Sequence, residues 1–294
     1  MDEGRIMRSL SGFYDVETAD GAVVRCRARG KFRKEGITPL VGDRTAFQRT
    51  GEEGVLWEIF PRKNAFLRPP VANIDQMVIV ASAVIPVTDP FLIDRIAVIA
   101  ENRGCEPVIC VNKDDLDRGN RYFDTYSPAG YRTIRTSAVT GEGIDELREA
   151  LREKTSAITG NSGVGKSSIL NALEPAFGLT VGEVSDKLGR GRHTTRHVEL
   201  YRLSCGAVIA DTPGFSAFDA EGAELGEAKD LQFAFREFRP FLNCCRYDDC
   251  LHLKEEGCAV REAVAAGAIS GSRYGSYVRL MEQARTLHPW EKKK

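Results

Sequence analysis

The sequence lacks any long apolar run. Its 294 residues contain no stretch of about 18 apolar side chains, the length that a membrane-spanning helix requires. The first residues, Met1–Arg5, also lack the apolar centre of a signal peptide. The composition, 42% hydrophobic and 28% charged, is typical of a soluble globular protein. We therefore expect a cytoplasmic protein that has no membrane partner. We also expect it to be monomeric.

A net charge is also nearly absent, since the formal value is −1, but the charges are distributed unevenly. Residues 1–70 carry 13 Lys/Arg and 10 Asp/Glu, residues 71–225 carry 16 and 22, and residues 226–294 carry 12 and 10. The two ends are basic, so a large polyanionic partner should contact the ends. The same three segments are the predicted domains: a β-barrel, a central α/β domain and a C-terminal α-helical domain.

The N-terminal segment has short strands separated by turns, which predicts a small OB-like β-barrel. Residues 23–32 are expected to form one strand with a cation at every second position. That spacing would place five cations on one face: Arg25, Arg27, Arg29, Lys31 and Arg33. Because like charges on one face repel, the pattern favours a phosphate-binding face for RNA. The alternative is a solvated face paired with Glu35, Glu52 or Glu53. No clear aromatic stacking platform accompanies the cations, which favours contact with the RNA backbone.

From Gln76 onward the pattern changes. Apolar runs at 77–81 and 107–111 are typical of buried parallel strands, and residues 91–102 have the periodicity of an amphipathic helix. Strands that alternate with helices predict an α/β domain with a mainly parallel sheet.

A glycine-rich segment lies between a predicted strand and a predicted helix of this domain. It has the G-x-x-x-x-G-K-S pattern of a phosphate-binding loop. The glycines let successive backbone N–H groups point at one anion, Lys166 adds a charge for the β/γ-phosphates, and Ser167 offers a hydroxyl to Mg²⁺. The alternative is a chance glycine-rich turn. The predicted phosphate-binding residues are Gly160, Asn161, Ser162, Gly163, Val164, Gly165, Lys166, Ser167 and Ser168.

The second apolar strand runs directly into Asn112-Lys113-Asp114-Asp115, an N-K-x-D pattern at the strand end where ligands bind in such sheets. The Asp115 carboxylate can accept hydrogen bonds from guanine N1–H and the exocyclic amine, a donor pair that adenine lacks. Asn112 can reach N7, and the Lys113 stem can lie along the base. The alternative is the N-cap of the next helix. Ser137 and Ala138 end a third strand, where their N–H groups could meet guanine O6, although a strand-end turn also explains them.

Two segments after the phosphate loop supply predicted contacts to Mg²⁺ and the γ-phosphate. Residues 182–196 are polar and rich in glycine, which predicts a switch loop, and Thr194 or Thr195 would complete the Mg²⁺ shell. Asp211 follows an apolar strand and would hold Mg²⁺ through water, and the Gly214 N–H would meet the γ-phosphate. The predicted magnesium ligands are Ser167, Thr195 and Asp211.

Histidine is scarce, with four in the chain, whereas cysteine occurs eight times. Disulfides are not expected in a reducing compartment. A polar segment of about 14 residues offers three thiolates and one imidazole, which complete a tetrahedral shell for one structural Zn²⁺. The predicted ligands are Cys245, Cys250, His252 and Cys258. Cys244 could replace Cys245, although the spacing favours Cys245. The other cysteines are expected to be inert core thiols, namely Cys26, Cys105, Cys110 and Cys205.

The base-reading elements precede the phosphate loop, whereas a Ras-like chain has them last. This order is that of a circular permutation, which a compact domain with close termini tolerates. With the basic barrel before it and the cysteine-rich segment after it, the chain resembles the RsgA/YjeQ family of ribosome small-subunit-dependent GTPases over nearly its whole length. The resemblance implies an OB-fold, a permuted GTPase domain that uses GTP/GDP, and a zinc domain. It also implies action on the small ribosomal subunit and its rRNA late in assembly.

The resemblance extends to catalysis. Phe215 occupies a place near which Ras-like GTPases have a water-orienting Gln, and the family is similar in having a hydrophobic residue there. Phe215 cannot orient water, so we expect slow intrinsic hydrolysis, with the missing group coming from the switch loop or the partner. His193 is the internal candidate, and its alternatives are binding an RNA phosphate or resting in solvent. The predicted catalytic residues are His193, Thr194, Thr195 and Lys166.

Two other interpretations stay open at this point. The chain could be a zinc-stapled rRNA-binding module that uses GTP/GDP only as an affinity switch. It could also be a P-loop ATPase or kinase with a chance N-K-x-D sequence. Multiple turnover in the presence of subunits separates an enzyme from the binding module, and the base preference of an Asp115→Asn variant tests the third interpretation.

Overall fold

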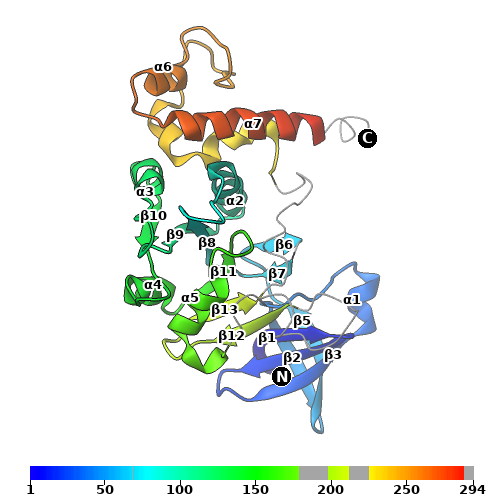
Figure 1. Cartoon of the computed structure of the whole chain (residues 1–294). Coiled ribbons are helices and arrows are strands. Elements are labelled where there is room, and N and C mark those ends of the chain that lie inside the picture. Colours follow the sequence, from blue (N-terminus) through cyan, green and yellow to red (C-terminus); the bar gives the residue numbers. More distant parts are fainter. Residues whose placement is uncertain (68, 179–197, 212–224, 288–294) are drawn as a thin grey trace. The chain divides into compact units, whose positions relative to one another are not determined.

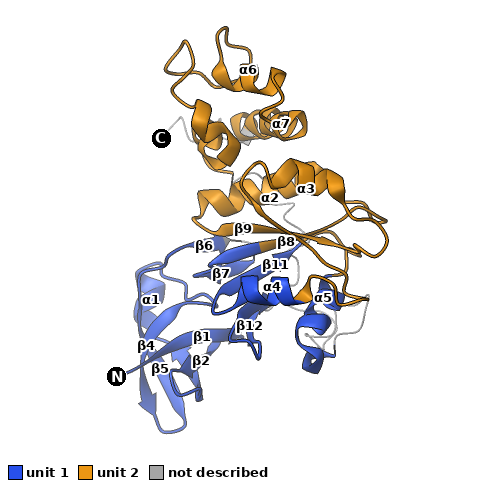
Figure 2. Cartoon of the chain, turned by 90° about the vertical axis from the view of Figure 1, so that its left-hand side faces the viewer, with its two compact units in different colours: residues 1–77, 145–159, 166–218 blue, residues 78–144, 160–165, 219–294 orange. Residues whose placement is uncertain are grey.

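The protein is divided into two compact units that share the chain in alternating segments (Figure 2). The computed structural model describes residues 1–67, 69–178, 198–211 and 225–287. Unit 1 consists of residues 1–77, 145–159 and 166–218, and unit 2 consists of residues 78–144, 160–165 and 219–294. The domain boundaries expected near residues 70 and 225 remain a prediction.

The N-terminal part of unit 1 is a closed five-stranded β-barrel (Figure 1). Its strands are β1 (Asp2–Leu10), β2 (Phe13–Thr18), β3 (Val23–Ala28), β4 (Arg44–Thr50) and β5 (Glu53–Ile59). They pair in the order β1-β2-β3-β5-β4, and the additional pairing of β1 with β4 closes the barrel. Ile6, Val16 and Leu56 are fully buried in its core. The β-barrel expected from the sequence is therefore confirmed.

A short helix, α1 (Gly30–Lys34), replaces the end of the expected basic strand. The prediction of a single strand over residues 23–32 is wrong, because β3 ends at Ala28. Lys31 and Arg33 therefore lie in α1 and do not continue the strand face. Phe32 is the buried residue of this helix. Lys and Arg are good helix formers, so their alternation with Phe32 is compatible with one helical turn as well as with a strand.

The rest of unit 1 contains the strand that leads into the phosphate loop. Its elements are β6 (Ala65–Leu67), β7 (Pro70–Ala72), most of α4 (Ile144–Leu151), β11 (Thr155–Thr159), α5 (Lys166–Leu173), a 3-10 turn η1 (Pro175–Phe177), β12 (Glu199–Arg202) and β13 (Val208–Asp211). Strand β11 is parallel to β13, and β12 is antiparallel to β13. All five residues of β11 are buried, as expected for a strand inside an α/β sheet.

Unit 2 contains the strands and helices that carry the base-reading motif. They are β8 (Gln76–Ser82, whose first two residues belong to unit 1), α2 (Pro90–Asn102), β9 (Glu106–Asn112), α3 (Asn120–Tyr126) and β10 (Arg132–Arg135). The strands lie in the order β10-β9-β8, and β9 and β10 are parallel. The Asp89 side chain caps the start of α2 by accepting a hydrogen bond from the Phe91 N–H.

The C-terminal part of unit 2 is helical. It consists of two 3-10 segments, η4 (Ala228–Ala234) and η5 (Arg236–Phe241), followed by α6 (Ala259–Ala265) and α7 (Gly271–Leu287). Phe235, Phe238 and Tyr277 form its aromatic core, with ring centroids 4.9–5.2 Å apart. Helix α7 packs against α2 (Figure 1). Among the described residues, none of the helices has the length and apolar character needed to cross a membrane.

A buried arginine joins α7 to the rest of unit 2. The Arg273 side chain has no exposed surface. Its Nη1 donates to Asp94 Oδ1 at 2.6 Å, its Nε to Glu237 Oε1 at 2.7 Å, and its Nη2 to the Tyr131 hydroxyl at 3.0 Å. A buried charge is tolerated only when it is paired and hydrogen-bonded, so this contact fixes the place of α7 against α2 and η5.

Candidate nucleotide and metal sites

The glycine-rich segment forms the loop between β11 and α5. Gly160, Gly163 and Gly165 have φ values of 140°, 79° and 97°, which disfavour any other residue. A Cβ atom at Gly160 would lie 2.2 Å from the Val80 carbonyl oxygen, and one at Gly165 would lie 2.3 Å from Asn112 Nδ2. These contacts explain the glycines sterically, because the backbone passes too close to its neighbours to admit a side chain.

Lys166 and Ser167 form the first turn of α5. Ser167 is buried, and burial lowers the pKa of the Lys166 amine to about 8. An anion placed against this amine would stabilise its charged form and counteract the effect of burial. The start of α5 with Lys166 is therefore suited to phosphate, and the N–H groups of the loop that precedes it in the chain are predicted to share this role.

Asn112, at the end of β9, connects the base-reading motif to the phosphate loop. Its Nδ2 donates a hydrogen bond to the Val164 carbonyl oxygen at 2.9 Å. Its Oδ1 accepts bonds from Thr136 Oγ1 and from the Ala138 N–H, each at 3.3 Å. One buried amide thus holds the two motifs in register. Asn112 therefore has a structural role in joining the two motifs. Its expected contact with guanine N7, and that of the Ala138 N–H with guanine O6, remain predictions.

The Asp115 carboxylate is oriented by a neighbouring hydroxyl. Ser137 Oγ donates to Asp115 Oδ1 at 2.6 Å, so two residues predicted for guanine recognition do meet. Lys113 adopts a left-handed backbone with φ of 66°, and its Nζ donates to the Ile85 carbonyl oxygen at 2.7 Å. Nothing in the sequence points to Ile85, since backbone acceptors carry no sequence signal.

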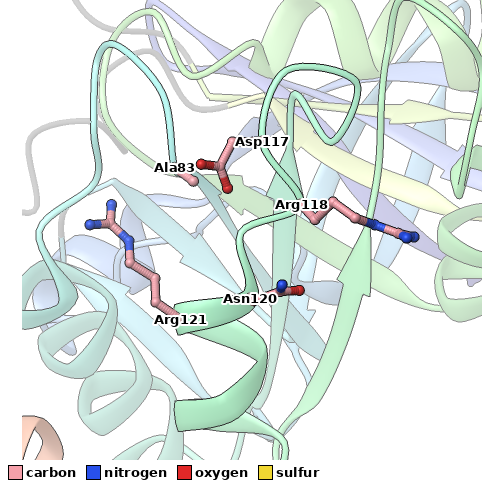
Figure 3. A pocket seen from close by; sticks show the side chains of 5 residues that line it. All are labelled: Ala83, Asp117, Arg118, Asn120 and Arg121. Atoms are coloured by element: carbon pink, nitrogen blue, oxygen red, sulfur yellow. The ribbon is translucent and has the colours of Figure 1, made fainter.

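A pocket of about 520 Å³ is lined mainly by residues that follow this motif in the sequence (Figure 3). The residues that line it are Ala83, Asp117, Arg118, Asn120 and Arg121. Figure 3 shows the two arginine side chains extending in opposite directions. Asp117 Oδ1 accepts a hydrogen bond from the Gly119 N–H at 2.7 Å, which shapes the loop. The lining is polar and mixed in charge, and it includes none of the residues expected to read guanine.

Several predicted residues lie outside what the structure describes. They are His193, Thr194, Thr195 and Gly214. For Asp211 the backbone is described, at the end of β13 and paired with Glu199. The predictions for Mg²⁺, the γ-phosphate and the attacking water at these positions therefore remain predictions.

The four residues predicted to bind zinc come together in the C-terminal part. Their ligand atoms all lie within 4.8 Å of one another. His252 Nδ1 lies 3.5 Å from Cys245 Sγ, 3.5 Å from Cys250 Sγ and 3.4 Å from Cys258 Sγ. Tetrahedral Zn²⁺ with ordinary bond lengths places such atoms roughly 3.5–3.8 Å apart, so the donor set fits this metal. The neighbouring Cys244 is exposed and lies outside the cluster.

Contacts outside the cluster orient the imidazole. His252 Nε2 lies 2.9 Å from Gln232 Oε1. An imidazole that offers Nδ1 to a metal carries its proton on Nε2, and Gln232 is placed to accept that hydrogen bond. Burial lowers the pKa of His252, which favours the neutral, metal-binding form. The hydroxyls of Tyr274 and Tyr277 on α7 donate to the carbonyl oxygens of His252 and Leu251, each at 2.8 Å.

A β-barrel followed by a base-reading motif and then a phosphate loop defines a circularly permuted GTPase with an N-terminal barrel. The chain belongs to the RsgA GTPase family. The family model for the RsgA GTPase matches residues 59–221, and that for the RsgA N-terminal domain matches residues 3–56. The family assignment, the multidomain fold class and GTP hydrolysis, all expected from the sequence, are confirmed.

Curated relatives cover nearly the whole chain. A protein of Geobacillus kaustophilus, named small ribosomal subunit biogenesis GTPase RsgA, is 48% identical over 296 residues, which is 98% of this chain and 99% of the relative. A protein of the same name from Caldanaerobacter subterraneus is 46% identical over 287 residues, with 96% of each chain covered.

Solved structures agree with this assignment. YjeQ from Thermotoga maritima is 35% identical, with a TM-score of 0.83 over 97% of this chain and 98% of that one. YloQ, described as a circularly permuted GTPase, is 38% identical, with a TM-score of 0.81 over 98% of this chain and 96% of that one.

Proposed function

We propose that this GTPase acts in the biogenesis of the small ribosomal subunit, where it hydrolyses GTP to GDP and phosphate in response to the subunit. The observation that carries the proposal is the Asn112–Val164 hydrogen bond, which joins a guanine-reading loop to a phosphate loop. The relatives that share the whole chain are named for this process. Contact with rRNA, action in the cytoplasm and a monomeric state belong to the same proposal.

The proposal assigns a role to each part of the nucleotide site. Asp115, held by Ser137, accepts hydrogen bonds from guanine and rejects adenine, because adenine leaves the carboxylate unpaired. The N–H groups of the glycine-rich loop hold the phosphates, and Lys166 places its charge on the β/γ bridge. When bound, Mg²⁺ neutralises charge on the β- and γ-phosphates, and Ser167, Thr195 and Asp211 would hold it.

The remaining roles fall on the segments after the phosphate loop. Gly214 donates its N–H to the γ-phosphate, and His193 or a group of the partner orients the attacking water. Phe215 cannot act as that group because its side chain has neither a donor nor an acceptor. A chain that lacks its own water-orienting group hydrolyses GTP slowly alone and quickly on its partner.

The C-terminal site has a structural role in the proposal. Cys245, Cys250, His252 and Cys258 would hold one Zn²⁺ with four protein ligands, a full shell that leaves no position for substrate. The metal would fix the loop that α7 and the aromatic core surround. This part of the protein would then act as a rigid surface toward the subunit.

The decisive experiment is GTP turnover with and without purified small ribosomal subunits. Large subunits and ATP serve as controls. We expect strong stimulation by small subunits alone and with GTP alone. Turnover that small subunits leave unchanged would remove the ribosome from the proposal and leave the guanine site in place.

A further inference from the structure

One face of the barrel carries two aromatic side chains among arginines. Phe13 on β2 pairs directly with Arg27 on β3, and Arg27 pairs with Val55 on β5. Directly paired residues of neighbouring strands project from the same face. Trp57 lies two residues beyond Val55, and Arg29 lies two beyond Arg27 in an extended conformation (φ −67°, ψ 146°), so both continue this face.

Each aromatic ring has a guanidinium against it. The Arg29 Cζ atom lies 3.7 Å from the centroid of Trp57, and the Arg27 Cζ atom lies 4.6 Å from the centroid of Phe13. Trp57 is 39% exposed. Tryptophan and arginine are enriched among the residues that carry most of the binding energy at interfaces. The Arg29–Trp57 pair is therefore a flat, accessible stacking surface with a positive charge on it.

The arginines at one end of this face have carboxylate partners, whereas the arginine at the other end has none among the described residues. Arg25 pairs with Asp15 at 3.0 Å, and Arg27 lies 3.7 Å from Glu53. Within the described part of the chain, no carboxylate lies within 4.0 Å of the Arg29 guanidinium. The end of the face that carries the more exposed ring thus also carries the unbalanced cation.

We infer that Trp57 with Arg29, and Phe13 with Arg27, form a stacking site for unpaired RNA bases. The inference rests on the proposed function for the presence of RNA, and it goes beyond contact with the RNA backbone. An unpaired base can stack on the indole in place of the Arg29 guanidinium, which lies against that ring when no RNA is bound. The phosphates beside that base meet the arginine charges. A base inside a duplex has both faces covered by its neighbours, so the site selects single-stranded segments.

The chain offers a direct optical test. It has two tryptophans, at positions 57 and 290, so the Trp290→Phe variant leaves Trp57 as the sole indole. This variant is titrated with short oligoadenylate and oligouridylate RNA, with an RNA duplex of the same length, and with tripolyphosphate. We expect quenching of Trp57 fluorescence by the two single strands, and little change with the duplex or the bare anion.

Substitutions measure the contribution of each ring. Affinity for labelled oligoadenylate is followed by fluorescence anisotropy. Trp57→Ala should weaken binding roughly tenfold, Phe13→Ala somewhat less, and Trp57→Phe much less than Trp57→Ala, because a phenyl ring still stacks. Arg49→Ala is the matched control: it removes an exposed barrel arginine that pairs with Asp2. It should weaken binding by no more than about threefold. Circular dichroism and thermal unfolding establish that each variant folds.

Three results would overturn the inference. Equal quenching by tripolyphosphate would mean that the face binds phosphate only, and equal quenching by the duplex would mean that it does not select unpaired bases. If a folded Trp57→Ala variant kept its RNA affinity, and an acidic peptide displaced RNA from the wild-type protein, the face would instead bind a protein partner. Stimulation of the wild-type enzyme by small subunits is measured separately, so the inference can fail while the proposed function stands.

Discussion

At the scale of single residues, we propose that Asp115 decides which base the site accepts. Replacing Asp115 with Asn exchanges one acceptor for a donor, so guanine meets a mismatched group whereas xanthine finds a complementary one. We expect GTP affinity to fall roughly a hundredfold or more and XTP to become the preferred nucleotide. Competition binding of GTP, XTP and ATP measures the change. Asp117→Asn is the control, because an amide oxygen can still accept the bond from the Gly119 N–H; a similar loss there would place base selection elsewhere.

The thiols provide a second prediction at this scale. Burial raises the pKa of Cys26 to about 11 and that of Cys110 to about 12. At about pH 8 both remain protonated in the folded protein, and only the thiolate reacts with iodoacetamide. The exposed Cys244 should therefore be alkylated first, and Cys26 and Cys110 only after unfolding, with rates that rise as the pH is raised. Peptide mass spectrometry follows each site. Early labelling of Cys110 in folded protein would contradict the burial described for β9.

Residue types and spacing were sufficient to predict that the four residues of the Cys–His cluster come together. The same reasoning predicts the phosphate loop and the guanine motif, whose ligand contacts remain predictions. These sites need particular side chains at fixed intervals, and intervals are visible in a sequence. The Asn112–Val164 bond was missed because its acceptor is a backbone oxygen. The pairing of Phe13 with Arg27 was missed because it depends on the register of two strands. Cys205 was expected in the core, yet it is only partly buried.

At the scale of elements, the contact between α7 and α2 depends on Arg273. Substituting Met would leave the carboxylates of Asp94 and Glu237 buried without their cation, which costs roughly 3–5 kcal/mol. Arg239→Ala is the matched control, since Arg239 pairs with Glu101 but its side chain is 55% exposed, and its loss should cost less than about 1 kcal/mol. Urea unfolding gives both free energies. Equal effects of the two substitutions would mean that the buried network does not secure α7.

The segment after β3 shows how an element can be mispredicted. Alternating charged and apolar residues satisfy a strand, but over one turn they also satisfy a helix with a single buried side chain. Phe32 is that side chain. The local sequence pattern could not distinguish a strand from a helix here, because the outcome depends on how the Phe32 side chain packs in the folded protein. The consequence for function is that α1 carries Lys31 and Arg33, and the strand face keeps Arg25, Arg27 and the aromatic rings.

At the scale of the whole molecule, the metal cluster and the nucleotide site should respond independently. The thiol-rich loop has few apolar side chains of its own, so metal binding is expected to supply much of its stability. If the cluster holds zinc as proposed, Cys250→Ser should release it and speed hydrogen exchange across residues 244–258, while GDP affinity changes less than about threefold. Metal analysis measures zinc content, hydrogen-exchange mass spectrometry measures exchange in residues 244–258, and titration measures GDP affinity. Cys244→Ser should leave all of them unchanged, and zinc loss in that variant would contradict the ligand set.

The alternation of segments between the two units has a consequence for how the protein is made. A ribosome delivers the chain from its N-terminus, and domains generally fold in that order. The barrel strands emerge first and can close at once, because they are contiguous. The loop proposed to read the base emerges next, but the proposed phosphate-binding residues 160–165 follow only later, and α7 belongs to unit 2 as well. In a nascent chain the barrel, which we propose binds RNA, is therefore complete well before residues 160–165 can join the proposed nucleotide site.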